Sequence, residues 1–393
     1  MGTAFGLATV GAAYEAGLLV VDGPQVLVVV ASSAVPEEAT PLAEIEGVTA
    51  LLGRFDAVHD LNEAIAPRHP RRWRPCDADL PGWERRLRLR WGLGDDDVSL
   101  LTESVAGEPA HALARIFAEA PLEVYADGLM SYGPTGGPVT ADLGDRLRRL
   151  LHLDLVPGLV PALHREWGVE GTVIPSDALR DVVRDGLAEH PSAPGERPPT
   201  ALVLGQYLAA DGLMDDDEEL DLYAEMVRRC VDAGYARVVF KQHPSAPSRQ
   251  GEDLPGRLAR AERPPTGVSV ARRAELAEAW YAGGRTDLVV ACFSTALLTA
   301  ATCYGLPVAR LGTGSLLERL TSTTNLNLVP VLLVDATVPD LATQTPGPVR
   351  VPEGLQGVLD AVSYVREPPT GSGPAPGRPT GDGCDPRRPD AAG

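Results

Sequence analysis

The chain has 393 residues, of which 44 % are hydrophobic, and a formal net charge of −19 at pH 7. This length and this apolar content fit a folded protein of about two domains with sizeable buried cores. The acidic balance argues against a general nucleic-acid-binding protein, because such proteins need basic surface to displace counterions from phosphates.

The sequence also argues against a membrane-spanning or disulfide-rich protein. No uninterrupted apolar stretch reaches the roughly 20 residues that a helix needs to cross a bilayer. The apolar opening segment lacks a basic leader and is interrupted by Glu15, which makes it a poor signal peptide. The five cysteines are widely spaced without a C-x-x-C pair, which predicts reduced thiols rather than a disulfide framework or a zinc site. We therefore expect a cytoplasmic protein, and peripheral association with the inner membrane face is compatible with this location.

The first half alternates predicted helices and strands, which is the pattern of a parallel α/β sheet. An apolar helix opens the chain, whereas a doubly wound domain normally opens on a strand; either the first strand is missing or the true start lies upstream. Residues 25–33 form a continuous β-branched run that is typical of a strand covered on both faces. The further elements predicted in this half are a helix at 41–52, a strand at 96–104, a helix at 109–120 and a strand at 122–128.

A proline-, glycine- and charge-rich stretch divides the chain and predicts a linker at 191–199. Residues 1–190 then form one Rossmann-like domain, and residues 200–366 form a second. The second domain repeats the alternation, with strands and following loops predicted at 200–208, 235–244, 286–295 and 306–312 and helices at 215–234, 273–284 and 296–305. The tail at 367–393 is rich in proline and glycine with few apolar residues, so we expect it to be disordered.

A single lysine stands among 34 arginines, and it ends a predicted strand. Lys241 is followed two residues later by His243 and then by Pro244. Ligands of open α/β sheets bind beyond the carboxyl ends of the strands. The proline ring restricts the backbone of the preceding histidine, so this imidazole is rigidly aimed and suited to protonate a leaving group or to bind a phosphate. A turn histidine that bonds only to backbone is the alternative, and the neighbouring ammonium weakens it.

Two hydroxyl-bearing segments each follow a predicted strand and open a helix. The first contains Ser294 and Thr295, and the second contains Thr313 and Ser315. Hydroxyls and free backbone N–H groups at a helix N-terminus form an anion site. Plain N-capping accounts for the same residues equally well, and the second segment matches no P-loop because no Gly-Lys-Ser/Thr follows it.

Acidic side chains end two neighbouring strands of the first half. Asp127 is followed by Gly128, which permits a tight turn, and its carboxylate is suited to act as a general base toward a hydroxyl. An isolated Asp-Gly pair is otherwise a common turn former. Glu103 and Ser104 end the neighbouring strand and are second-rank candidates for binding an acceptor.

Basic residues are concentrated in the segment 68–90, where eight arginines oppose three acids. Such a cluster is commonly a solvated helix face, yet in an otherwise acidic chain it is also suited to attract a polyanionic acceptor. Arg71 and Arg72 are our candidates for this binding. The segment also contains three tryptophans that would offer flat surfaces to sugar rings: Trp73, Trp83 and Trp91.

Three segments, VYADGLMSYGPT, VVFKQHPSAP and CFSTALLTA, follow one another along the chain. In this order they resemble the motifs of the bacterial alpha-2,8-polysialyltransferase family and of related CMP-sialic acid-dependent sialyltransferases. The resemblance spans about Ala4 to Leu341. It implies an α/β GT-B glycosyltransferase in which two Rossmann-like domains, one for the acceptor and one for the nucleotide-sugar donor, face each other across a cleft.

The resemblance also implies an activity and a set of roles. The expected reaction is an inverting, metal-independent transfer of sialic acid or a related nonulosonic acid from its CMP-activated form onto a glycan of the cell surface. Asp127 is expected to deprotonate the acceptor, and His243 to bind and protonate the leaving phosphate. Ser294 and Thr295 are expected to hold the phosphate or nearby donor atoms, with Lys241 adding a charge. The CMP-sugar is a substrate, so no cofactor is expected, and the sequence shows no metal-ligand cluster.

One position departs from the family pattern. The family has two acids before the glycine, and here the first of them is Ala126, so catalysis would depend on Asp127 alone. Gly128 and Pro244 complete the predicted donor-binding set. Two other functions stay open. A transferase that builds a teichoic-acid-type polymer from a CDP-activated alcohol would share the architecture and the CMP leaving group, and an inactive CMP- or glycan-binding protein would account for Ala126.

Overall fold

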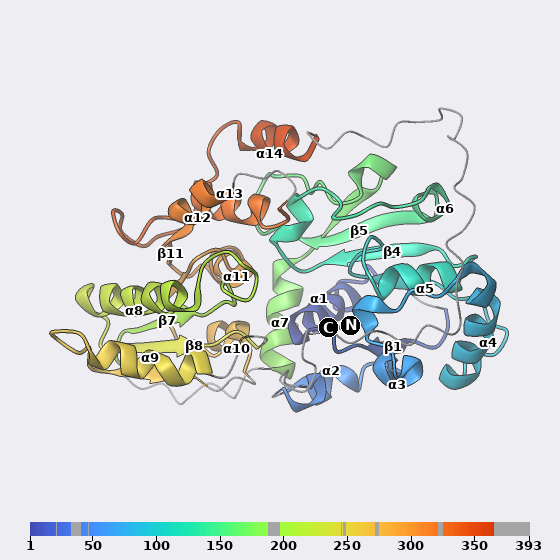
Figure 1. Ribbon diagram of the computed structural model, residues 1–393, viewed down its shortest axis with the longest axis horizontal. Helices are drawn as coiled ribbons and strands as arrows, with labels where there is room; N and C mark the ends of the chain where they lie inside the picture. The colour runs from blue at the N-terminus through green and yellow to red at the C-terminus, as the bar shows by residue number, and fades with distance from the viewer. Residues whose placement is uncertain are drawn as a thin grey trace.

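The structure is a computed structural model, and it describes residues 1–20, 22–32, 41–45, 47–187, 197–244, 246, 249–271, 275–320 and 325–364. The predicted tail and most of the predicted linker lie outside these residues. The described elements form two α/β groups, with helix α7 (Ser176–Gly186) between them (Figure 1).

The strands that precede α7 form two parallel sheets. One sheet pairs β1 (Val26–Val29) with β2 (Ala57–Asp60), and the other has four strands in sequential order: β3 (Leu100–Thr102), β4 (Leu122–Ala126), β5 (Leu147–Leu153) and β6 (Glu170–Ile174). The strands predicted at 25–33, 96–104 and 122–128 are confirmed in shorter form. Leu27 and Val29 of β1 pack against one apolar cluster and Val28 packs against another, so both faces of this strand are covered, although only Leu27 is fully buried.

The helices of the first half cover these sheets. They are α1 (Ala4–Glu15), α2 (Val48–Leu52), α3 (Leu61–Ile65), α4 (Leu80–Trp91), α5 (Ala110–Ile116) and α6 (Ala141–Gly144), with 3-10 turns η2 (Leu42–Glu44), η3 (Pro70–Arg72), η4 (Asp77–Asp79), η5 (Leu129–Tyr132) and η6 (Arg165–Trp167). The single helix predicted at 41–52 is wrong, because η2 and α2 are separate. Gly47 divides them with a φ of 78°, in the left-handed region that glycine favours.

The second half is one five-stranded parallel sheet in the order β11-β10-β7-β8-β9. Its strands are β7 (Thr200–Leu204), β8 (Arg237–Lys241), β9 (Val268–Val270), β10 (Leu288–Ala291) and β11 (Val308–Arg310). Its helices are α8 (Asp216–Asp232), α9 (Arg249–Ala259), α10 (Ala277–Ala282), α11 (Thr295–Tyr304), α12 (Thr313–Arg319), α13 (Leu328–Thr337) and α14 (Leu355–Tyr364). The strand order reverses between β7 and β10, and ligands of open α/β sheets bind at such a switch point.

Helix α7 joins the two halves. It packs against α1 on one side and against α10 and α11 on the other, and Arg180 of α7 donates a hydrogen bond of 2.8 Å to the carbonyl of Cys303. Helix α14 returns to the first half, where Asp360 forms an ion pair of 3.0 Å with Arg165. Two Rossmann-like groups of parallel strands in one α/β chain confirm the expected GT-B class of fold.

Two further expectations concern membranes and cysteines. Within the described ranges, no helix has the length and apolar character that a membrane crossing requires. Cys230, Cys292 and Cys303 are free and buried, whereas Cys76 is disulfide-bonded, so the prediction of reduced thiols fails at this one described cysteine.

Candidate active site

Asp127 lies one residue beyond the end of β4, at the first turn of α1. Its Oδ2 accepts a long hydrogen bond of 3.5 Å from Thr3 Oγ1, and the same Thr3 hydroxyl accepts one of 2.9 Å from the Gly6 backbone N–H as the N-cap of α1. A Cβ on Gly6 would lie 3.1 Å from Asp127 Oδ2, so the glycine permits the helix to approach the carboxylate closely. The positive end of a helix dipole is a favourable neighbour for a carboxylate.

The protonation of Asp127 is poised near neutral pH. Burial, and after it the carboxylates of Glu103 and Glu278, together raise the pKa of this carboxyl to about 7, against hydrogen bonds from its own backbone and Thr3, which lower it. A group with a pKa near the working pH takes up and releases a proton readily, which is the property a general base needs.

The loop that carries Asp127 is attached to the second half of the chain by Thr295, the first residue of α11. Thr295 Oγ1 accepts a hydrogen bond of 3.2 Å from the Leu129 backbone N–H. A Cβ on Gly128 would lie 3.1 Å from the same oxygen, whereas the Gly128 φ of −142° suits any residue. Glycine is therefore needed here for space rather than for backbone conformation, and the predicted Asp-Gly pair and Thr295 come together.

The two serines predicted at helix N-termini, Ser294 and Ser315, make fewer contacts than Thr295. Ser294 is half-buried and caps α11, because its hydroxyl accepts a hydrogen bond of 3.2 Å from the Ala296 backbone N–H. Ser315 is exposed on α12. Ser294 therefore lies at the end of the strand-to-helix turn where we predicted a phosphate contact, while its hydroxyl also serves the helix.

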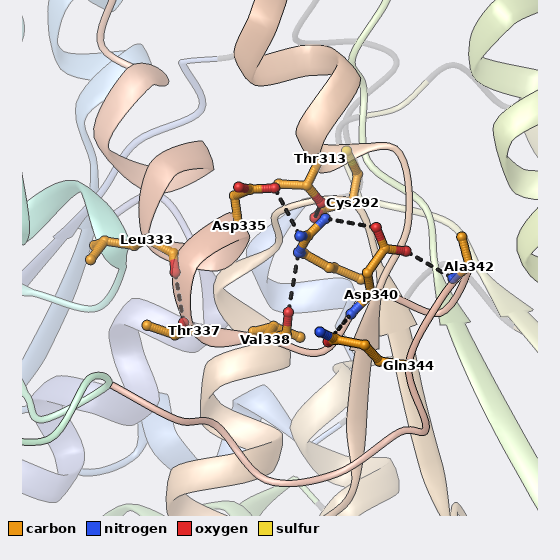
Figure 2. A network of polar contacts seen from close by, with 10 residues as sticks. Cys292, Thr313, Leu333, Asp335, Thr337, Val338, Asp340, Ala342 and Gln344 are labelled. Carbon is orange, nitrogen blue, oxygen red and sulfur yellow. Dashed lines mark hydrogen bonds and ion pairs between the residues drawn. The ribbon is translucent and has the colours of Figure 1, made fainter. Parts of the chain in front are cut away.

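Thr313 is fully buried and belongs to a network of polar contacts beneath the surface (Figure 2). Its hydroxyl donates a hydrogen bond of 2.5 Å to the Cys292 carbonyl. Nearby, Asp335 and Asp340 form ion pairs of 3.0 and 3.3 Å with Arg310 of β11. These contacts hold α12 and α13 against the sheet, and the Thr313 hydroxyl bonds to the chain itself beneath the surface.

His243 lies two residues beyond the end of β8 and is half-buried. Its ring meets the ring of Tyr207 edge-on, with centroids 4.5 Å apart and an interplanar angle of 60°. The His243 carbonyl accepts a hydrogen bond of 3.0 Å from the Ala246 backbone N–H, which closes the turn that contains Pro244. The imidazole is thus held by the proline-containing turn on one side and by an aromatic ring on the other.

Tyr207, which contacts His243, also lies near charged residues of the first half of the chain. Burial raises the pKa of the Tyr207 phenol, the carboxylates of Asp211 and Glu103 raise it further, and the guanidinium of Arg71 lowers it. Glu103 and Arg71 therefore lie close enough to Tyr207 to act on its charge. The acidic strand ends of the first half and the histidine turn of the second half are parts of one region.

A polar scaffold holds the loop that carries Tyr207. Gln206 Oε1 accepts a hydrogen bond of 3.0 Å from the Phe293 backbone N–H, which links the ends of β7 and β10 at the switch point. Glu219 is buried and accepts hydrogen bonds of 2.8 and 3.0 Å from the backbone N–H groups of Leu208 and Ala209.

Lys241 is buried, with 4 % of its surface exposed, and its Nζ donates a hydrogen bond of 3.3 Å to the Gln242 carbonyl. Burial lowers the pKa of its ammonium to about 8, against the carboxylates of Glu278 and Glu275, which raise it. Glu278 in turn accepts a hydrogen bond of 3.0 Å from Thr299 Oγ1. The single lysine thus lies among internal carboxylates of α10 and its preceding turn, and its expected contact with a donor stays a prediction.

The predicted basic cluster divides into two parts. Arg71 and Arg72 are exposed on η3, and the Arg71 charge lowers the pKa of Asp211 in the second half, a carboxyl whose pKa is raised overall by burial. Helix α4, which carries the four arginines between Arg85 and Arg90, lies at the edge of the molecule away from the second half (Figure 1). Arg71 is therefore placed near the candidate site, unlike the arginines of α4.

The expectation that the tryptophans form sugar-binding surfaces is wrong for two of them. Trp73 and Trp91 are 1 % and 6 % exposed and belong to an apolar cluster under α4 and α5. Trp83 is half-buried, packs edge-on against Trp73 with centroids 5.1 Å apart, and lies 4.9 Å from the Arg86 guanidinium. The sequence of this basic segment does not show which of its tryptophans are buried in the core.

Glu103 and Ser104 follow β3, the neighbour of β4. Glu103 lies at the strand end with part of its surface exposed. The protein atoms around its carboxyl keep water away from it, and this loss of hydration raises its pKa. The Ser104 hydroxyl accepts a hydrogen bond of 3.2 Å from the Ala106 backbone N–H, so it stabilises its own turn. Of this pair, Glu103 is the residue that acts on Asp127.

A pocket of about 320 Å³ opens beside Tyr207, between the loop after β7, the start of α8 and α9. Its lining includes Met214, Glu219, Gln250 and Asp253. The rule that ligands bind at strand ends would have found Gln206 and Tyr207, which follow β7 directly. Glu278 was missed because a glutamate inside an alanine-rich helix carries no sign of burial in the sequence.

Two α/β halves of parallel strands, with Asp127 following a strand of one half and His243 following a strand of the other, fit a glycosyltransferase of the GT-B class. A family model for alpha-2,8-polysialyltransferase (POLYST) matches residues 1–313. The chain belongs to the alpha-2,8-polysialyltransferase family. Among curated proteins, none matches it significantly.

Comparison with solved structures also gave matches at low sequence identity. MurG of Acinetobacter baumannii has 15 % sequence identity and a TM-score of 0.40, with 86 % of this chain and 91 % of that chain covered. The Escherichia coli heptosyltransferase WaaC, solved with ADP-2-deoxy-2-fluoro heptose, has 14 % identity and a TM-score of 0.29, with coverages of 79 % and 88 %.

Proposed function

We propose that this chain transfers sialic acid or a related nonulosonic acid from its CMP-activated form to a hydroxyl of a glycan, with inversion and without a metal ion. The observation that supports this most is the position of Asp127, a carboxylate with a pKa near neutral whose loop contacts α11 of the donor half through Leu129 and Thr295. A base from one half is thereby brought to the edge of the other.

The proposed step has one proton donor and one proton acceptor. The acceptor hydroxyl loses its proton to the Asp127 carboxylate as its oxygen forms a bond to the anomeric carbon. The bond between that carbon and the phosphate oxygen breaks, and His243 gives a proton to the leaving CMP. Inversion requires the nucleophile and the leaving group on opposite faces of the sugar, which suits a base and an acid that come from different halves.

The donor would lie along the switch point between β7 and β10. Ser294 and the positive end of the α11 helix dipole are suited to bind the phosphate. The pocket beside Tyr207 has a volume that suits a nucleoside, and its lining carboxylates favour ribose hydroxyls or an amine over phosphate. Lys241 would add positive charge from below the surface.

The acceptor would approach from the first half. Arg71 is exposed and acts on groups of the second half, so an anionic glycan could be drawn toward the base. Cell-surface polysaccharide is the family expectation for such an acceptor. We also propose that the enzyme acts in the cytoplasm, at the inner face of the membrane.

The direct test measures CMP release from CMP-sialic acid and from CDP-glycerol, with and without glycan acceptors. We expect release from CMP-sialic acid that persists in EDTA. Turnover of CDP-glycerol alone would point to a teichoic-acid-type polymer transferase, and CMP binding without turnover of any CMP-sugar would point to an inactive binding protein. Either result would reject the proposal.

Two variants test the roles of the proposed acid and base. We expect His243→Ala and Asp127→Asn each to lower kcat by about 100-fold or more, because each removes a positioned proton-transfer group. His111→Ala and the exposed Asp145→Asn are matched controls outside the site, for which we expect wild-type rates. Full activity of either site variant would remove that residue from the mechanism.

A further inference from the structure

Glu103 lies on the same face of the first-half sheet as Asp127. In the parallel pair β3 and β4, Leu101 is opposite Glu123 and Thr102 is opposite Val124, so the next step of this register places Glu103 opposite Tyr125. Paired residues of neighbouring strands point to the same face, and alternate residues along a strand share a face. Glu103, Tyr125 and Asp127 therefore share one face.

The packing of the neighbouring residues supports this assignment. Leu101 and Tyr125 belong to the apolar cluster that includes α1, and the Tyr125 hydroxyl lies 3.3 Å from Met1 Sδ. Asp127 contacts Thr3 at the start of the same helix. Strand-end residues of both strands thus converge beneath the N-terminus of α1.

Ala126 points the opposite way. It is 6 % exposed and belongs, with Leu122 and Val124, to the apolar cluster on the other face of the sheet. An acid at position 126 of this chain would therefore enter that cluster instead of joining Asp127. In this chain, an acid at the position where the family has its first acid would therefore point away from the site.

We propose that Glu103 takes the place of the missing second acid and acts as a positioning residue, whose negative charge sets the protonation of Asp127. This inference rests on the proposed function, in which Asp127 is the base. The second carboxylate comes from the neighbouring strand end instead of the neighbouring residue. Glu103 and Asp127 then form a pair of acids in this chain, although the two-acid motif before Gly128 has only one.

Like charges at neighbouring strand ends disfavour simultaneous ionisation, so the two carboxyls titrate as a pair. After burial, the Glu103 carboxylate is the next cause of the raised Asp127 pKa, and it also raises that of Tyr125 together with Asp127. The other groups that act on the pair are Glu278 of α10, the Thr3 hydroxyl and the α-amino group of Met1, which lowers the pKa of Glu103.

The test is a titration of the Asp127 carboxyl carbon by NMR, in full-length protein labelled at Asp and Glu carboxyls, with Asp127→Asn to assign the signal. We expect Glu103→Gln to lower the Asp127 midpoint by about one unit, as expected for removal of one nearby like charge. Glu103→Asp should restore most of the shift. Glu170→Gln removes the same charge from an exposed position at the opposite, amino end of β6 and should leave the midpoint unchanged.

The pH profile of kcat/KM for CMP release gives the second measurement. Its acidic limb should move to lower pH in Glu103→Gln by the same amount as the NMR midpoint, and it should stay in place in Glu170→Gln. An Asp127 midpoint that is equal in Glu103→Gln and wild type would overturn the inference. The NMR result does not depend on turnover, so a chain that releases no CMP would reject the proposed function while leaving this inference decided by the titration.

Discussion

Thr295 Oγ1 accepts a 3.2 Å hydrogen bond from the Leu129 backbone N–H, and this contact places the turn after Asp127 against the first residue of α11. The two residues are far apart in sequence and belong to different halves. Because the same oxygen lies 3.1 Å from where a Gly128 Cβ would be, the geometry of the acidic turn depends directly on one side chain of the donor half.

Loss of this contact is expected to affect rate more than stability. Thr295→Val keeps the shape of the side chain but removes the acceptor, and we expect kcat to fall by about tenfold through misplacement of the Asp127 loop. Thr302→Val is the matched control, since its hydroxyl bonds within α11 to the Leu298 carbonyl. A wild-type kcat for Thr295→Val with correctly folded protein would show that the contact does not position the base.

Gly128→Ala is expected to force the two halves apart locally. The added methyl would lie 3.1 Å from Thr295 Oγ1, which is tighter than ordinary contact, so we expect a lower Tm and a lower kcat. Combining it with Thr295→Ala removes the crowded oxygen and should recover part of the lost Tm. Equal Tm values for the single and double variants would contradict the steric explanation.

Ala126→Asp, which recreates the two-acid sequence, is expected to impair the protein. The new carboxylate would enter the apolar cluster around Val124, beside His152 of β5, and a buried charge there costs about 3 kcal/mol of unfolding free energy. Urea unfolding measures this cost, with Ala126→Val as a control for size. An active Ala126→Asp variant of unchanged stability would show that position 126 does face the site.

The raised pKa of Asp127 predicts a stability that falls with pH. Its folded-state pKa of about 7 exceeds the ordinary value of 3.8, so the folded state holds this proton more strongly, and stability is lost as pH rises through about 7. Asp127→Asn should match wild type below pH 3.8 and should exceed it above pH 7, by about 1 kcal/mol for this partly exposed group. Unfolding free energies across this range test it; no gain above pH 7 would mean that the carboxyl is not destabilised.

Much of the fold was predictable from local patterns. The apolar β-branched runs of β4, β7, β8 and β10 and the acid-capped helix α8 show their structure in sequence, because burial on both faces and helix capping leave strong local signals. Strands β2, β5, β6 and β9 were missed. In β5, for example, Arg148 and Arg149 mix charge with apolar groups, and β9 has only three residues, so it is pairing with neighbours that makes these segments strands.

The candidate site was predictable at its strand ends but not in its contacts. The rule that ligands bind beyond parallel strands singled out Asp127, His243 and Thr295. The composition of the basic segment did not distinguish Trp83 from the two tryptophans of the core, because burial depends on which helices pack together.

The sequence by itself determined the α/β class, the acid and histidine that end strands of different halves, and the family resemblance, since these depend on residue order and local chemistry. Only the tertiary structure decided which way each side chain faces. Strand register places Glu103 on the face of Asp127 and turns Ala126 away from it, and burial places the lone Lys241 among internal carboxylates. Both outcomes depend on contacts between segments distant in the chain, and such contacts leave no mark in a local stretch of residues.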